Sequence, residues 1–379
     1  MLLTKPKFIA IDSSILSEWS KDAYSSDGTR RKIANAVLNQ ISSKNWIIVI
    51  TWHHFEELLR YSDDTAVENR MRFILNLPLV AWVWRADGLN EIGSVVDVLA
   101  AEVKTYLSTE PDIATKKFIF ATKNCLLRFG IPSYLPTLNK WRELRSATMV
   151  LGKMQQKIAS LIHATPDNNS NVPLSALRDK NPLSSEEQKQ AYRNEISTLK
   201  EELATRGDKR ILQDEKTAQN FCNDIFSNIA KISESKQTMD KAFVEQFGYF
   251  QDQLPKDITL GEFKGMVVRY NHLANSVKQL GLEIGSVWPK LKECRFPSEE
   301  IISEIRISRR NAPRASGSDL NDDYIASLIP YLDAVIIDKR IHEYLLQARK
   351  RNPWILILTD SMLKANSYRC LPNLLSKKS

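Results

Sequence analysis

The chain has 379 residues, of which 43% are hydrophobic and 26% are charged, and this composition is ordinary for soluble proteins of two or three structural units. It contains no run of eighteen apolar residues, which argues against a membrane-spanning helix. The first residues, "MLLTKPKF", lack the apolar core and cleavage site of a signal peptide. We therefore expect a cytoplasmic protein that does not contact a membrane.

The charge and the cysteine content indicate which partners and which kinds of site to expect. The net charge is +8, and residues 301–379 hold 13 Lys and Arg against 8 Asp and Glu, so the positive excess is concentrated at the C-terminal end. Such an excess favours a polyanionic partner. The four cysteines stand far apart without a CxxC pair, which indicates neither a zinc site nor a disulfide framework. We expect them to be buried apolar side chains.

The first ninety residues alternate between strand and helix patterns. The segments "KFIAID" and "NWIIVITW" are short and apolar, as strands are, and a polar helical stretch around residues 30–42 lies between them. The segment "HHFEELLRYSDDTAVENRMRFILNL" then predicts helix, and "PLVAWVW" predicts a third strand. This order is typical of a parallel sheet with helical crossovers.

Between residues 93 and 306 the strand patterns disappear and long helical patterns replace them. Ser184 and Glu187 form a capping box at the start of one such helix, and the Asn-, Pro- and Ser-rich residues 163–185 predict a loop before it. The alternation then resumes with "YLDAVIID", "KRIHEYLLQARKR" and "PWILILT", which predict strand, helix and strand. The predicted fold is an α/β domain, residues 1–92 and 307–379, interrupted by an all-helical insertion, residues 93–306.

Carboxylates follow or face the predicted strand ends in four separate segments. Asp12 ends the first strand, Glu56 and Glu57 begin the helix after the second, and Asp338 ends the strand "AVIID". A fourth group, Asp319, Asp322 and Asp323, opens the helix in "GSDLNDDYIAS". Each acid could simply cap its own helix. Because the carboxyl ends of parallel strands share one sheet edge, the acids could also meet there.

A cluster of such acids has a chemical use. Carboxylates held close together repel one another, and a divalent cation compensates for that repulsion. Mg²⁺ and Mn²⁺ prefer oxygen ligands and can activate water against a phosphodiester. We therefore predict a Mg²⁺ or Mn²⁺ site at this edge.

Four motifs in order resemble the PIN domain, a family of mostly metal-dependent nucleases that act on RNA. "IAIDSSIL" is similar to the family's "hhhDtnhh" motif and places Asp12 as a ligand, with Ser14 orienting it. "FEELL" is similar to the "hxEhh" helix and selects Glu57. "DDYIAS" and "VIIDKRI" match the last two motifs through Asp322 and Asp338, although Ile337 replaces the usual Thr or Ser. The resemblance covers residues 5–90 and 315–360.

The resemblance implies a PIN-like three-layer fold and phosphodiester hydrolysis, most often of RNA, with DNA as the alternative substrate. Asp12, Glu57, Asp322 and Asp338 would be the catalytic metal ligands, and Asp323, Glu56 and Asp319 the second choices. Dimers are common in the family, so a homodimer is one expectation, and the insertion could instead contact a protein partner. Whether such an enzyme acts alone, as a toxin with an antidote or in antiviral defence stays open.

Basic residues beside the acids are candidates for contacts with a nucleic-acid backbone. They are Arg309, Arg310 and Arg314, upstream of the third acid motif, and Lys339 and Arg340, directly after Asp338. A solvated helix end is the alternative explanation for this run.

Three other functions compete with the nuclease. His53 and Glu57 share a helical face and could bind zinc, but no second histidine motif accompanies them. A haloacid dehalogenase-type phosphatase would need a second Asp where Ser14 stands. An inactive PIN-like scaffold, in which the acids serve as caps and the insertion binds a partner, is the non-enzymatic alternative.

Overall fold

The computed structural model describes residues 5–89, 91–109, 114–130, 141–164, 170–177, 185–206, 219–220, 223, 254–255, 257–309 and 319–378. The chain divides into two compact units. The first comprises Met1–Lys153, Leu273–Ala312 and Ser318–Ser379, and the second comprises Met154–His272 and Pro313–Gly317. Among the described residues, no helix combines the length and apolarity needed to cross a membrane.

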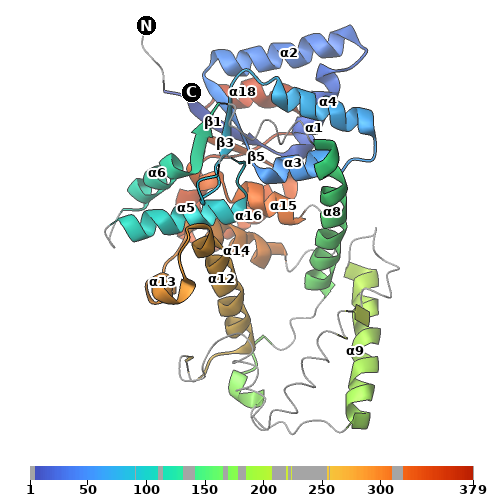
Figure 1. Ribbon diagram of the computed structural model, residues 1–379, viewed down its shortest axis with the longest axis vertical. Helices are drawn as coiled ribbons and strands as arrows, with labels where there is room; N and C mark the ends of the chain where they lie inside the picture. The colour runs from blue at the N-terminus through green and yellow to red at the C-terminus, as the bar shows by residue number, and fades with distance from the viewer. Residues whose placement is uncertain are drawn as a thin grey trace. The chain divides into compact units, whose positions relative to one another are not determined.

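The first unit is built on a six-stranded sheet with the order β4-β3-β2-β1-β5-β6. Figure 1 shows strands β1, β3 and β5 of this sheet among the helices of the unit. Neighbouring strands are parallel except β3 and β4. This arrangement confirms the predicted α/β class. The strands are β1 (Lys7–Ile11), β2 (Trp46–Ile50), β3 (Val80–Val83), β4 (Leu127–Phe129), β5 (Ala334–Ile337) and β6 (Met362–Lys364).

Helices cover both faces of the sheet because the central strands bury side chains on both sides. In β1, Ile9 and Ile11 belong to one apolar cluster, and Phe8 and Ala10 belong to the other. The first cluster is covered by α1 (Ser13–Ala23), α2 (Gly28–Ser43), α3 (Trp52–Leu59), α4 (Asp64–Leu75) and α18 (Leu371–Ser376). The second is covered by α5 (Val95–Ser108), α6 (Thr115–Leu126), α14 (Pro297–Arg309), α15 (Asp319–Ala326), α16 (Lys339–Arg351) and α17 (Pro353–Leu358).

A third apolar cluster of the first unit joins α5 and α6 to the end of α12 (Leu260–Gln279) and to α13 (Ile284–Leu291). The second unit has its own buried side chains, including Leu199 and Leu203 of α9 (Ser185–Arg206) and Phe263 of α12. A short 3₁₀ helix, Leu174–Leu177, follows a β-bridge between Pro173 and Thr259. The helices α8 (Trp141–Ala164) and α12 each run from one unit into the other.

The second unit is smaller than the insertion expected at residues 93–306. The first unit includes part of the expected insertion, because α5 and α14 bury apolar faces that include Val98, Ala101, Ile301 and Ile305 against the sheet. The expected helix after Ser184 is present as α9, but Ser184 itself lies outside the described residues.

Two further expectations differ from the structure. The segment "PWILILT", predicted as the closing strand, is helix α17. Pro353 occupies its first turn, and Ile355 and Leu358 are buried three residues apart while Leu356 and Ile357 are exposed, which is helical periodicity. The cysteines are not uniformly buried, since Cys125 and Cys370 are exposed and Cys294 is half-buried.

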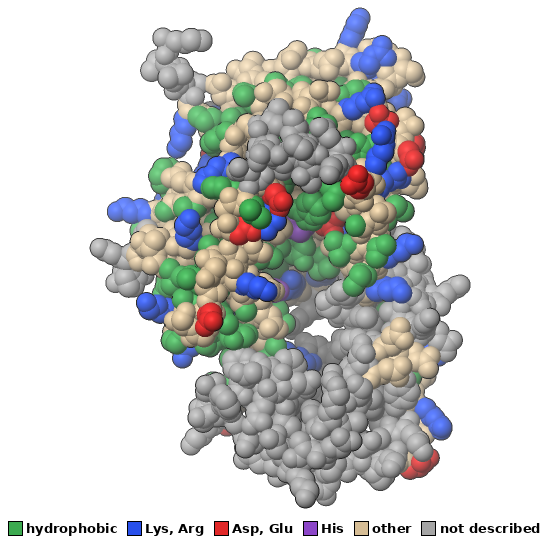
Figure 2. Space-filling view, viewed as in Figure 1, with side chains coloured by type: hydrophobic (Ala, Val, Ile, Leu, Met, Phe, Trp, Pro, Cys, Tyr) green, Lys and Arg blue, Asp and Glu red, His purple; other side chains and the backbone are tan. Residues whose placement is uncertain are grey.

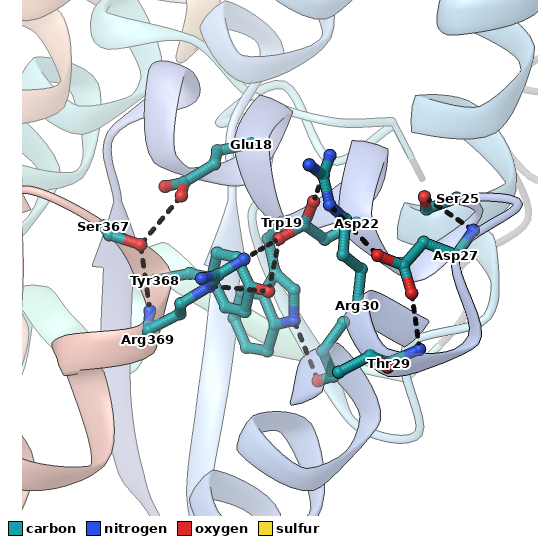
Figure 3. A network of polar contacts seen from close by, with 11 residues as sticks. Glu18, Trp19, Asp22, Ser25, Asp27, Thr29, Arg30, Ser367, Tyr368 and Arg369 are labelled. Carbon is teal, nitrogen blue, oxygen red and sulfur yellow. Dashed lines mark hydrogen bonds and ion pairs between the residues drawn. The ribbon is translucent and has the colours of Figure 1, made fainter. Parts of the chain in front are cut away.

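A buried carboxylate ties the 3₁₀ helix Tyr368–Cys370, which precedes α18, to α1, the helix that follows β1 (Figure 3). Asp22 accepts hydrogen bonds from the Tyr368 hydroxyl at 2.8 Å and from Arg369 at 2.7 Å, and the charge of Arg30 lies 4.0 Å away. The Tyr368 ring stacks on Trp19, with ring centroids 5.4 Å apart. Although burial works against ionisation, these donors hold the pKa of Asp22 below its usual range. The network fixes the position of α1 relative to the C-terminal segment.

A second buried acid, Glu102 of α5, joins three elements on the opposite side of the sheet. It accepts hydrogen bonds from the Ser298 amide at 2.8 Å, from the Ser298 hydroxyl and from the Tyr331 hydroxyl. Burial outweighs these donors and raises the pKa of Glu102 to about 8. The folded chain therefore keeps a proton on Glu102 at neutral pH.

We expect the ionisation of Glu102 to lower the free energy of unfolding as the pH rises from about 5 to about 8. The folded pKa of Glu102 lies above the unfolded value, so the folded state binds the extra proton and loses that advantage as the pH increases. The slope should be at most about 1.4 kcal/mol per pH unit. Urea unfolding of wild type and Glu102→Gln across this range measures the difference, and parallel pH profiles for the two proteins would contradict it.

Candidate active site

Asp12 lies where β1 ends and α1 begins, and both its backbone amide and its side chain form hydrogen bonds there. Its amide donates to the Ile336 carbonyl of β5 at 2.9 Å, and its Oδ1 accepts from the Ser14 amide at 2.8 Å and from the Ser14 hydroxyl. Asp12 is therefore the N-cap of α1, and Ser14 orients it. Burial raises its pKa, Ser14 opposes that shift, and the charge of Asp338 adds to it.

Asp338 occupies the equivalent position at the end of the neighbouring strand. Ile11 of β1 and Ile336 of β5 are paired in the parallel register, so Asp12 and Asp338 follow adjacent strand ends. Asp338 is half-buried and caps α16, with Oδ1 accepting from the Ile341 amide at 2.7 Å. Capping and clustering thus coexist at both acids.

Two histidines fix the start of α3, which carries Glu57. The Thr51 amide donates to His54 Nδ1 at 3.0 Å, so the ring proton is on Nε2, which donates to the Ile11 carbonyl at 3.0 Å. Burial lowers the pKa of His54 to about 4, so it is neutral at physiological pH. His53 accepts from the Val95 amide through Nε2 and contacts Glu56 through Nδ1, 3.4 Å from Oε2. With both rings engaged in this way, the structure offers no zinc site at His53 and Glu57.

Glu57 and Asp322 reach the site from opposite faces of the sheet. The helices α3 and α15 meet beyond the strand ends, where the rings of His53 and Tyr324 have centroids 4.4 Å apart. Burial raises the pKa of Glu57, and the charge of Asp12 raises it further. Burial also raises the pKa of Asp322 well above its usual value, with contributions from Glu57, Asp12 and Asp338. The structure therefore brings all four predicted acids within electrostatic range of one another.

The neighbouring acids have different partners. Glu56 is buried and ion-paired with Arg60, and His53 contacts its other oxygen. Asp323 is fully buried and forms a two-point pair with Arg309, in which Nη1 lies 3.0 Å from Oδ2. Both acids therefore stabilise the fold. Adjacent side chains on a helix point about 100° apart, so Glu56 and Asp323 point in different directions from their neighbours Glu57 and Asp322. The side chain of Asp319 lies outside the described residues.

Two buried polar side chains beside the acids were not predicted. Within the described structure, the Ser13 hydroxyl and both amide atoms of Asn321 lack a hydrogen-bond partner of good geometry, although both residues are close enough to Glu57 to lower its pKa. Buried polar groups are normally satisfied, so unsatisfied ones at a site point to a missing ligand. Their only signal in the sequence is adjacency, since Ser13 follows Asp12 and Asn321 precedes Asp322.

The residues present fit a hard divalent cation. Four carboxylates, an amide and a hydroxyl offer only oxygen and amide donors, the set that Mg²⁺ and Mn²⁺ prefer. Positive charge would also relieve the repulsion that raises the pKa values of these acids. As they stand, no three His, Cys, Asp or Glu side chains of the described chain are close enough to share an ion. Binding therefore requires the side chains to move together.

The predicted basic residues fall into three groups. Arg309 is occupied by its pair with Asp323, so its role is structural and we withdraw it as a nucleic-acid contact. Arg310 and Arg314 lie outside the described residues. Lys339 and Arg340 are exposed in the first turn of α16, beside the acids. On the face shown in Figure 2, the described Lys and Arg side chains are scattered over the surface and form no continuous patch.

Comparison with known proteins gives no assignment. No protein-family model matches the chain, and no curated protein or solved structure is detectably similar to it. The resemblance to the PIN domain therefore stays a prediction from motifs, and the geometry of the site carries the functional argument.

We expect removal of the charge of Asp322 to stabilise the protein and removal of the charge of Asp323 to destabilise it. Because the folded pKa of Asp322 is raised, its carboxylate costs stability as the pH rises above the ordinary Asp range, and Asp322→Asn should remove that cost. We expect a gain on the order of 1 kcal/mol at neutral pH without metal. Asp323→Asn removes the negative charge from the buried pair with Arg309 and should lose about 3 kcal/mol.

Urea unfolding in the presence of a chelator at neutral and acidic pH measures both variants. The gain from Asp322→Asn should shrink on acidification, as the wild-type carboxyl becomes protonated. A clear loss of stability in Asp322→Asn at neutral pH would show that Asp322 makes a structural contact instead.

Proposed function

We propose that the protein is a PIN-like, metal-dependent nuclease that hydrolyses phosphodiester bonds, with RNA as the substrate. The observation that carries this proposal is the convergence of Asp12, Glu57, Asp322 and Asp338 from four segments, with burial and mutual repulsion raising the pKa of the first three. Nothing in the fold requires four acids to share one edge, because two caps would suffice for α1 and α16. The preference for RNA comes from the motif resemblance alone.

The roles of the residues follow from their positions. Asp12, Glu57, Asp322 and Asp338 would hold one or two Mg²⁺ or Mn²⁺ ions, and the buried polar side chains of Asn321 and Ser13 lie beside Glu57. When bound, such an ion activates water and stabilises the negative charge that develops on the phosphate. Ser14 holds Asp12 in place, and His54 ties α3 to the end of β1, so these two residues position the ligands.

The substrate backbone would lie over the first turn of α16. Lys339 is exposed there, and Arg340 is 45% exposed, so both can reach a phosphate outside the acid cluster. A substrate held by such contacts loses affinity as salt concentration rises.

An inactive scaffold is the second candidate. It is favoured by the fact that Asp12 and Asp338 both cap helices, which would preserve them without catalysis. In that case the second unit would serve as a protein interface. The two candidates differ in whether metal binds, since a ligand that binds only the folded state raises its melting temperature.

Asp12→Asn, Glu57→Gln and Asp338→Asn should each abolish Mn²⁺-dependent cleavage of single-stranded RNA and should abolish the thermal stabilisation by Mn²⁺. Each change removes one anionic ligand while keeping the size of the side chain. Glu343→Gln is the matched control, because Glu343 lies on α16 but is exposed and outside the cluster. Cleavage is followed on a labelled oligonucleotide, and stabilisation by calorimetry.

Retained cleavage in all three variants would eliminate the proposed mechanism. Absence of Mn²⁺ stabilisation in the wild type, with Glu343→Gln identical to it, would favour the scaffold.

A further inference from the structure

Arg340 is a cation that the structure places beside two acids of the cluster. It lies in the first turn of α16, two residues after Asp338. Its Nε is 3.2 Å from Oδ2 of Asp338, and its Nη2 is 3.7 Å from Oδ2 of Asp322. One guanidinium therefore bridges acids from two segments, the end of β5 and the helix α15.

The electrostatic need for this bridge is clear from the acids themselves. Burial and three neighbouring carboxylates disfavour the charged form of Asp322, and Arg340 acts in the opposite direction. Without the positive charge of Arg340, the repulsion among the carboxylates of the cluster would be stronger. Arg340 thus supplies part of the positive charge that a divalent ion would supply.

A comparison with Arg309 shows that the Arg340 bridge is loose. Arg309 is 11% exposed and grips Asp323 with two nitrogens in a fork-to-fork pair. Arg340 is 45% exposed and touches each of its two carboxylates with a different nitrogen, at longer distances. Partly exposed pairs of this kind are weak. The contacts of Arg340 with Asp322 and Asp338 are therefore longer and more exposed to solvent than the pair of Arg309 with Asp323.

We propose that Arg340 is a resident counter-ion of the metal-free site, which a divalent ion displaces from Asp322 and Asp338, and which then turns outward to bind a backbone phosphate of the substrate. This inference rests on the proposed nuclease function. It makes metal and substrate binding sequential, because Asp322 and Asp338 cannot satisfy the ion and Arg340 equally at once. The guanidinium reaches the substrate only after the ion has taken its place.

The test compares Mn²⁺ affinity in four full-length proteins by isothermal titration at mildly alkaline pH, which limits competition from protons. Arg340→Ala removes the competitor and should bind Mn²⁺ about three- to tenfold more tightly than wild type, the size expected for two partly exposed ion pairs. Arg340→Lys keeps the charge without the fork and should be intermediate. Lys339→Ala removes one positive charge from the adjacent exposed position and controls for the general field.

The second half of the inference is measured by cleavage of single-stranded RNA at saturating Mn²⁺. Arg340→Ala should raise KM several-fold with a smaller change in kcat, and Arg340→Lys should restore part of the loss in KM. A KM that does not change in Arg340→Ala would overturn the phosphate contact.

The outcomes separate this inference from the proposed function. If wild type binds Mn²⁺ and Arg340→Ala binds it no more tightly than Lys339→Ala, the counter-ion role is overturned while the metal site stands. If none of the four proteins binds Mn²⁺, the proposed function fails and the inference fails with it. Tighter binding in Arg340→Ala alone among the two alanine variants supports the exchange.

Discussion

The constraint on which this site depends is the burial of like charges at one edge of a parallel sheet. Four carboxylates from separate segments are placed together at this edge, where burial and neighbouring charges raise the pKa values of Asp12, Glu57 and Asp322. Such an arrangement lowers stability and persists only where another property outweighs the cost. In the proposed function, a divalent cation would turn the same repulsion into binding energy, so the cost to the protein without metal and the affinity for metal would share one origin.

The fold separates acids that serve the site from acids that serve the structure. On α3, Glu57 faces the cluster while Glu56 pairs with Arg60, and on α15, Asp322 faces the cluster while Asp323 pairs with Arg309. The rotation of about 100° per residue allows adjacent acids to have opposite roles. The structural member of each pair is neutralised by its own arginine, and this ion pair anchors the helix. The paired acids thus help to hold Glu57 and Asp322 in their orientation toward the cluster.

How far the sequence predicts this structure depends on the range of the interactions involved. The buried strands and the strand-end acids are local signals, and the alternation of elements then brings Asp12 and Asp338 side by side. Strand β4 has only three residues, and α17 contains β-branched residues typical of strands, so local patterns miss the first and misassign the second. The orphaned amide of Asn321 and the Arg340 bridge depend on tertiary packing between segments, and no local pattern encodes them.

The order of the strands explains why this edge, and not another, collects the acids. From β1 the chain moves to β2 and β3 on one side, and after a long excursion it returns to β5 and β6 on the other side. The switch between these directions falls between β1 and β5, where the helices that follow the two strands pack on opposite faces of the sheet. Asp12 and Asp338 stand at this switch point. Asp12 and Glu57 precede the excursion and Asp322 and Asp338 follow it, so the site is complete only when both parts of the sheet have joined. A chain that has folded one part alone carries half of the proposed ligands, so in the proposed function assembly of the sheet would be a condition for metal binding.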